Sequence, residues 1–227
     1  MKYSHLLFDA DDTLFDFPKA SSRAFSIMCE AHGISNSPEI YQLYHEINLE
    51  LWAAFDQGEV TKEFVTLERY VRFFKALDID EDPAQCNRDY LAALGQVVYP
   101  LPHAEAVCRT LAERGHRLYI VTNAVASVQR SRLRNCAFGD LFTGAFISEE
   151  AGASKPSRAY YDYVRACVPA ITSENTLVIG DSLATDIRGA NNAGFPCCWF
   201  NPGGKPRQEG LRIDYEVTDL RELLDIV

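Results

Sequence analysis

A short apolar run near the start of this 227-residue chain ends directly in a group of carboxylates. The run Leu6–Phe8 is typical of a buried β-strand, and Asp9, Asp11 and Asp12 follow it at once. Like charges repel at such short range, and carboxylates beside a core also lose hydration. Folding alone gives no reason to place them there. A divalent cation would hold them together, and one of the aspartates could then act as a nucleophile.

Short apolar strands alternate with helical patterns over most of the chain. Strands are predicted over residues 3–8, 117–121, 144–147, 176–179 and 196–200, and helices near residues 103–114, 125–136, 157–167 and 184–193. This alternation predicts an α/β fold with a Rossmann-like three-layer core, in which helices cover both faces of a central parallel sheet. Ligands of such sheets bind at the carboxyl ends of the strands. Three of the predicted strands are followed there by Asp9, Thr122 and Asp181.

The stretch between the first two predicted strands has a different pattern. Helical spacing fits residues 19–32, 38–56, 62–77 and 83–95, and no convincing strand lies among them. Aromatic residues are dense there, and we expect most of them to form the core of a small helical unit. The prolines at 100 and 102 disfavour a helix in the returning linker. The sequence therefore predicts two domains, a Rossmann-like catalytic core of residues 1–16 and 97–227 and an inserted helical cap domain of residues 17–96.

Composition restricts the possible partners. Hydrophobic residues make up 47% of the chain and charged residues 24%, an ordinary globular balance. The formal net charge of −10 disfavours nucleic-acid polymers and anionic membranes, because both bind basic surfaces. No apolar stretch approaches the roughly 20 residues that span a bilayer, and the start has no signal-peptide pattern. The odd number of cysteines, without CxxC spacing, predicts reduced thiols. We therefore expect a cytoplasmic protein.

Four polar motifs stand at predicted strand ends or helix starts. In chain order they are Asp9-x-Asp11-x-Thr13, Thr122-Asn123, Lys155-Pro156 and Gly180-Asp181-Ser182-x-x-Thr185-Asp186. With this combination the chain resembles the haloacid dehalogenase-like hydrolase superfamily, in the subfamily that carries a helical cap after the first motif. The resemblance covers nearly the whole chain. One short motif alone would be weak evidence, but four in order are specific.

The resemblance implies a role for each motif. Asp9 would be the nucleophile that forms an aspartyl-phosphate, and Asp11 would protonate the leaving oxygen and then deprotonate water. Asp9, Asp181 and the main-chain carbonyl of Asp11 would bind Mg²⁺, which prefers oxygen ligands. The phosphoryl oxygens would be contacted by Thr122, Asn123 and Lys155.

Supporting roles are implied for two further residues, and several residues also have a plainer interpretation. Asp186 would orient a metal-bound water or pair with Lys155, although a carboxylate is also favourable at any helix start. Thr13 would brace the loop. Thr122 could be a simple strand-end hydroxyl, and Asp12 is expected to face solvent or bond locally. The basic run of the predicted helix at 125–136 is expected to be a solvated face rather than a substrate clamp, and it consists of Arg130, Arg132 and Arg134.

The acid at position 11 separates the reactions known in this superfamily. Its dehalogenases lack an acid there, because halide leaves without a proton, so phosphoryl transfer is favoured. The segments 48–52, 58–61, 147–152, 192–194 and 198–201 are similar to those of bacterial pyrimidine 5′-nucleotidases. The resemblance implies a Mg²⁺-dependent phosphatase that acts on a small phosphorylated metabolite, with a pyrimidine nucleoside 5′-monophosphate as the favoured substrate.

Other functions stay open at this point. They include a sugar-phosphate or phosphoglycolate phosphatase, a β-phosphoglucomutase-like mutase and a 2-haloacid dehalogenase. A non-catalytic binding protein on the same scaffold would be expected to lose an acid or the lysine, and this chain retains both. Movement near residues 15–18 and 95–100 is expected, since water must be excluded during phosphoryl transfer and admitted for hydrolysis. The sequence leaves the oligomeric state undetermined.

Overall fold

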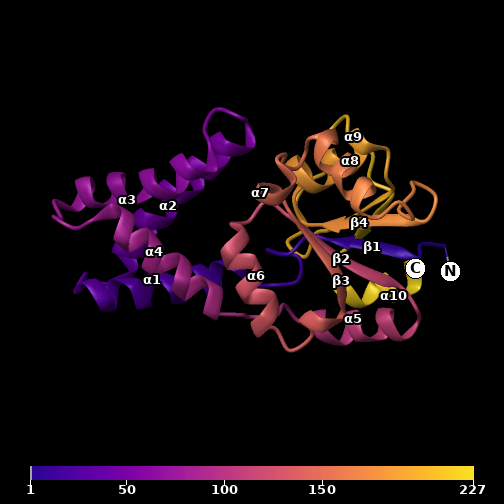
Figure 1. Cartoon of the computed structure of the whole chain (residues 1–227), viewed down its shortest axis with the longest axis horizontal. Helices are drawn as coiled ribbons and strands as arrows, with labels where there is room; N and C mark the ends of the chain where they lie inside the picture. The colour runs from indigo at the N-terminus through magenta and orange to yellow at the C-terminus, as the bar shows by residue number, and fades with distance from the viewer. Residues whose placement is uncertain (1) are drawn as a thin grey trace. The chain divides into compact units, whose positions relative to one another are not determined.

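The chain folds into two compact units, which we describe from a computed structural model of residues 2–227 (Figure 1). One unit comprises the start of the chain up to Phe17 together with Val98–Val227. The other unit comprises Pro18–Val97. Both ends of the second unit therefore join the first unit, so the second unit is an insertion in it.

A parallel sheet forms the centre of the first unit. Its six strands lie in the order β3-β2-β1-β4-β5-β6, and every neighbouring pair is parallel. The strands are β1 (His5–Phe8), β2 (Arg117–Thr122), β3 (Phe142–Ile147), β4 (Thr176–Gly180), β5 (Cys197–Phe200) and β6 (Tyr215–Val217). Phe8 aligns with Ile120 of β2 and with Ile179 of β4. The three central strands therefore end at one edge of the sheet.

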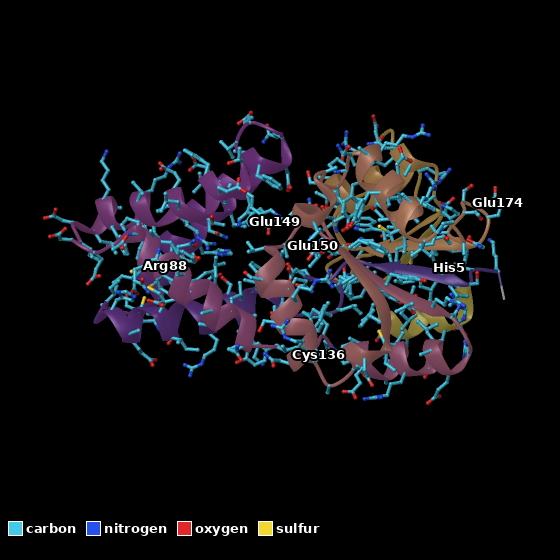
Figure 2. All side chains as sticks on the ribbon, in the orientation of Figure 1. His5, Arg88, Cys136, Glu149, Glu150 and Glu174 are labelled. Carbon is cyan, nitrogen blue, oxygen red and sulfur yellow. The ribbon has the colours of Figure 1, made fainter. Side chains whose placement is uncertain are left out.

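Helices cover both faces of this sheet and bury alternate residues of its strands (Figures 1 and 2). Leu6 and Phe8 pack in one apolar layer, whereas Leu7 packs in the other. Figure 1 shows α5 (Ala104–Glu113) and α10 (Leu223–Ile226) on one face, and α8 (Arg158–Cys167) and α9 (Arg188–Ala193) on the other. Because β1 is buried on both faces, its residues Leu6–Phe8 form an uninterrupted apolar run. The predicted three-layer α/β fold is confirmed.

The second unit is helical. It contains α2 (Pro38–Asp56), α3 (Lys62–Leu77), α4 (Pro83–Gln96) and all but the first residue of α1 (Phe17–His32). Side chains cap three of these helices: Ser37 accepts from the backbone of Ile40, Thr61 from Phe64, and Asp82 from Ala84. Aromatic side chains fill the interior, and the rings of Phe25 and Tyr44 stack with centroids 4.5 Å apart. Other buried rings there are Tyr70, Phe73, Phe74 and Tyr90.

Several short elements differ from the sequence predictions. The strand β6 and the one-turn helices α7 (Ser148–Ala151) and α10 were not predicted, because three or four residues are too few to show a period. The predicted helix at 184–193 begins as a π-helical turn over Leu183–Ile187, with α9 after it. In the described part of the chain, no helix is both long enough and apolar enough to cross a membrane. The seven cysteines are free, and only Cys167 is exposed.

Candidate active site

The first motif begins where β1 ends. The backbone N–H of Asp9 donates to the carbonyl of Ile179 at 2.8 Å, so pairing between β1 and β4 continues to this residue. Asp9 is almost completely buried, with 7% of the residue exposed. The hydroxyl of Thr13 donates to Asp9 Oδ2 at 3.2 Å. The main chain of the sheet and a neighbouring hydroxyl therefore hold Asp9 in place.

Lys155 lies at the centre of a buried ion cluster. Its Nζ donates to Asp9 Oδ1 at 2.6 Å, to Asp186 Oδ1 at 2.6 Å and to the carbonyl of Val121 at 3.0 Å. Burial disfavours the charge on Lys155, but Asp186 and Asp9 outweigh it and raise the pKa of the lysine. Lys155 therefore stays protonated. The structure brings together three predicted site residues that are widely separated in the chain.

The side chains of Thr122 and Asn123 have different surroundings. The amide of Asn123 bonds the backbone of Lys155 twice, because its Nδ2 donates to the Lys155 carbonyl at 3.0 Å and its Oδ1 accepts from the Lys155 N–H at 2.9 Å. The hydroxyl oxygen of Thr122 accepts from the N–H of Ala124 at 3.1 Å. The Thr122 hydroxyl can still donate its hydrogen to a ligand. The Asn123 Nδ2 uses one N–H to hold Lys155 and has a second N–H to donate.

Three carboxylates converge at this edge of the sheet. Asp9, Asp181 and Asp186 each offer an oxygen, and these atoms lie within 4.8 Å of one another. Burial, reinforced by Asp186, raises the pKa of Asp181 to about 7. Burial also raises the pKa of Asp9, although Lys155 opposes this. With all groups ionised, three carboxylates against one ammonium leave two negative charges in excess. This oxygen donor set and this charge fit Mg²⁺, with Asp9 and Asp181 as the carboxylate ligands.

The last motif depends on a glycine. A Cβ on Gly180 would overlap the Cβ, Cγ and Oδ2 atoms of Asp186. The missing side chain therefore makes room for the Asp186 carboxylate, whose Oδ2 accepts from the N–H of Ser182 at 3.1 Å. Asp181 is anchored through its main chain, because Nε1 of Trp199 donates to the Asp181 carbonyl at 2.8 Å. Close packing of this kind explains the glycine at position 180.

Asp12 forms a local bond, which is one of the two arrangements expected for it. Its backbone is left-handed, with a φ of 61°. Its Oδ1 accepts from the N–H of Phe17 at 3.2 Å. Burial, reinforced by Asp11, raises the pKa of Asp12 to about 6. Asp12 thus shapes the loop that leaves β1.

Asp11 lies outside the group of three carboxylates. Its Oδ1 instead accepts from Nη1 of Arg132 at 2.5 Å. The expectation that the basic run is a solvated face is therefore wrong for Arg132, which is completely buried. The expectation fits Arg134, which is exposed, and Arg130, which pairs at the surface with Glu150. Helical spacing was a usable signal, because Val128, Gln129 and Arg132 share the buried face of α6 (Ala126–Asn135).

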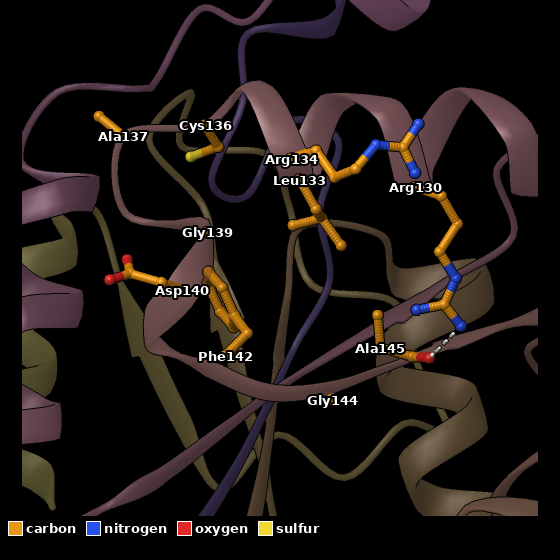
Figure 3. A pocket seen from close by; sticks show the side chains of 10 residues that line it. All are labelled: Arg130, Leu133, Arg134, Cys136, Ala137, Gly139, Asp140, Phe142, Gly144 and Ala145. Atoms are coloured by element: carbon orange, nitrogen blue, oxygen red, sulfur yellow. Dashed lines mark hydrogen bonds between the residues drawn. The ribbon is translucent and has the colours of Figure 1, made fainter.

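A hollow of about 510 Å³ lies apart from the four motifs, beside the edge strand β3 (Figure 3). Residues of α6, of the following turn and of β3 line it. Figure 3 shows Arg130 at its rim, where the guanidinium donates to the carbonyl of Ala145 at 3.2 Å. No residue of the four motifs lines this hollow. The site is therefore defined by its polar side chains and not by this hollow.

Comparisons with known proteins show relatives of the complete chain. The family model of the haloacid dehalogenase-like hydrolases matches residues 3–194. The HAD-hydrolase YfnB of Bacillus subtilis is 35% identical over 226 residues, which cover 100% of this chain and 96% of YfnB. A crystal structure of YfnB bound to magnesium, which reveals interdomain movement, matches with a TM-score of 0.93 and covers 100% of this chain and 99% of that one.

Two further relatives have described activities. The pyrimidine 5′-nucleotidase PynA of Streptococcus pneumoniae is 32% identical, and the match covers 99% of this chain and 95% of PynA. The pyrimidine 5′-nucleotidase YjjG of Escherichia coli is 30% identical, and the match covers 98% of this chain and 97% of YjjG. Both similarities extend over nearly all of the chain and therefore include the α/β unit and the helical insertion.

Proposed function

This chain belongs to the haloacid dehalogenase-like hydrolase family and is a phosphoric monoester hydrolase, and we propose that it is a Mg²⁺-dependent pyrimidine 5′-nucleotidase. The observation that carries the proposed chemistry is the buried contact of Asp9 with Lys155, beside Asp181. When a carboxylate attacks phosphorus, a positively charged group must lie beside the phosphoryl oxygens to stabilise their negative charge. Lys155 supplies one such charge.

In the proposed mechanism Asp9 attacks phosphorus and forms an aspartyl-phosphate. Lys155 and Thr13 each hold one oxygen of Asp9 before attack, which fixes the orientation of the carboxylate. When bound, Mg²⁺ would reduce the repulsion between the negative substrate phosphate and the carboxylates. Asp9, Asp181 and the main-chain carbonyl of Asp11 would hold it. Asp186 keeps Lys155 charged and in place.

The remaining motif residues complete the phosphoryl site. The Thr122 hydroxyl and the second N–H of Asn123 Nδ2 donate to phosphoryl oxygens, and the same Asn123 amide also holds the Lys155 backbone. Asp11 gives a proton to the leaving oxygen in the first step and takes one from water in the second. This acid disfavours the dehalogenase alternative, because halide needs no proton. We infer the domain roles, catalytic core and cap, and the cytoplasmic location from the sequence.

The similarity to PynA and YjjG supports the choice of a pyrimidine nucleotide. The test is a steady-state panel of pyrimidine and purine monophosphates, sugar phosphates and phosphoglycolate, each with Mg²⁺. We expect the highest kcat/KM for a pyrimidine nucleoside 5′-monophosphate. Indifference to pyrimidine monophosphates, together with high activity on a sugar phosphate, would contradict the proposed substrate. Failure to hydrolyse any phosphate ester would contradict the proposed reaction.

A further inference from the structure

Arg132 is a buried arginine whose charge is directed at one carboxylate of the site. It is 0% exposed, and its Nη1 donates to Asp11 Oδ1 at 2.5 Å and to Gln129 Oε1 at 3.3 Å. The guanidinium carbon lies 5.0 Å from the centre of the Phe15 ring. Phe15 also forms a backbone bridge with Asp11, so the same short loop carries both the carboxylate and the ring against which the arginine packs.

Stability alone does not explain this arrangement. Among residues 2–227, Nε and Nη2 of Arg132 are buried without a hydrogen-bond partner, and so is Nε2 of Gln129. Burying polar N–H groups without partners costs free energy, and well-packed apolar residues often replace buried ion pairs without loss of stability. Arg134, two residues further along α6, is exposed. An inward-facing arginine at position 132 must therefore be accounted for by what it holds, and it holds Asp11.

We propose that Arg132 is a positioning residue for proton transfer by Asp11. This inference rests on the proposed function. Arg132 anchors Oδ1 of Asp11 and leaves Oδ2 to carry the proton. In the first step an Asp9 oxygen bonds phosphorus, the phosphorus–oxygen bond to the leaving group breaks with its electron pair on that oxygen, and the oxygen takes the proton from Asp11. In the second step water attacks phosphorus, returns a proton to Asp11, and phosphate leaves Asp9.

The dependence of the rate on the leaving group separates this role from a structural one. An alkyl ester such as uridine 5′-monophosphate needs protonation of its leaving oxygen, whereas the leaving group of 4-nitrophenyl phosphate departs readily as an anion. The ratio kcat/KM reports only the steps up to phosphorylation of Asp9. The later deprotonation of water by Asp11 therefore does not affect this ratio. If the wild type does not accept uridine 5′-monophosphate, glucose 6-phosphate serves as the alkyl ester.

The variant Arg132→Met should lose about 100-fold in kcat/KM for the alkyl ester and less than about threefold for 4-nitrophenyl phosphate. The matched control Arg134→Met, on the exposed face of the same helix, should leave both values unchanged. Arg132→Lys, which keeps the charge, should recover part of the loss on the alkyl ester. In an Asp11→Asn background, Arg132→Met should cause no further selective loss. Circular dichroism and thermal unfolding check that each variant is folded.

Equal losses on the two esters, or a selective loss on top of Asp11→Asn, would overturn the inference. If Arg132→Met does not fold, the comparison of Arg132→Lys with the wild type decides by the same criterion. A wild type that hydrolyses neither ester with Mg²⁺ refutes the proposed function itself. A wild type that is active on both esters, with equal losses in the Arg132 variants, refutes only the role of Arg132.

Discussion

Gly180→Ala tests whether the space for the Asp186 carboxylate is as restricted as the structure indicates. The added methyl group would overlap three atoms of Asp186, including its carboxylate carbon. The carboxylate cannot simply rotate away. Its Oδ1 contacts Lys155 Nζ at 2.6 Å, its Oδ2 accepts from Ser182 at 3.1 Å, and the residue is only 1% exposed. Either the end of β4 shifts or the Lys155–Asp186 contact lengthens.

The size of the effect follows from that geometry. Adding a methyl group to a packed site costs about 1–3 kcal/mol, and each kcal/mol lowers Tm by about 2–4 °C in a chain of this length. We therefore expect a decrease in Tm of about 2–12 °C. Displacement of Asp186 leaves Asp9 as the only carboxylate on Lys155. A misplacement of about 1 Å in such a site lowers kcat by about 100-fold.

Gly144→Ala in β3 is the matched control. A Cβ on Gly144 would have its nearest contact at 3.6 Å, with the ring of Tyr119, which is an ordinary van der Waals distance. Its stability should change by less than about 1 kcal/mol and its kcat should equal that of the wild type. The assays are thermal unfolding followed by circular dichroism and initial rates on uridine 5′-monophosphate. Wild-type Tm and kcat in Gly180→Ala would refute the argument that Asp186 is confined.

Three further predictions concern the carboxylates and the helical unit. Asp9→Asn should abolish turnover with a Tm close to that of the wild type, and appreciable residual turnover would contradict its assignment as the nucleophile. EDTA should stop activity and Mg²⁺ should restore it, and turnover that survives EDTA would count against the metal site. Mg²⁺ at about 100 times its Kd should raise the free energy of unfolding of the wild type by about 2.7 kcal/mol. The same Mg²⁺ concentration should stabilise Asp181→Asn much less. His32 contacts Asp89 at 2.8 Å and Glu81 at 3.3 Å. The hydrogen bond to Asp89 raises the pKa of the His32 imidazole. Burial opposes this increase, and the hydrogen bond to Glu81 adds to it. Because the folded-state pKa is raised, the stabilisation is fully present below the ordinary value of about 6.5 and is lost as the pH rises through the folded-state value. Urea unfolding should therefore show a larger difference between wild type and His32→Gln at about pH 5.5 than at about pH 8.5, and a pH-independent difference would argue against the charged pair.

Local patterns were sufficient to predict five of the six strands and the longer helices around them. A strand buried on both faces is apolar over most of its length, so the runs that became β1 and β4 were visible in the sequence. Parallel strands bring their carboxyl ends to one edge, which predicted that Asp9 and Asp181 would lie close together. The strand β6 has only three residues and depends on pairing with β5, and therefore local pattern could not reveal it.

What the sequence by itself determined is the set of chemical groups at this edge of the sheet, because strand ends and motif spacing are local properties. Only the tertiary structure decided which partner each group has. Asp11 and Arg132 are 121 positions apart, and Asn123 and the Lys155 backbone are 32 positions apart. Side-chain pairing requires atoms to approach within about 3 Å, and packing of whole elements sets such distances. For that reason, a basic run that resembled a solvated helix face contains the arginine that binds Asp11.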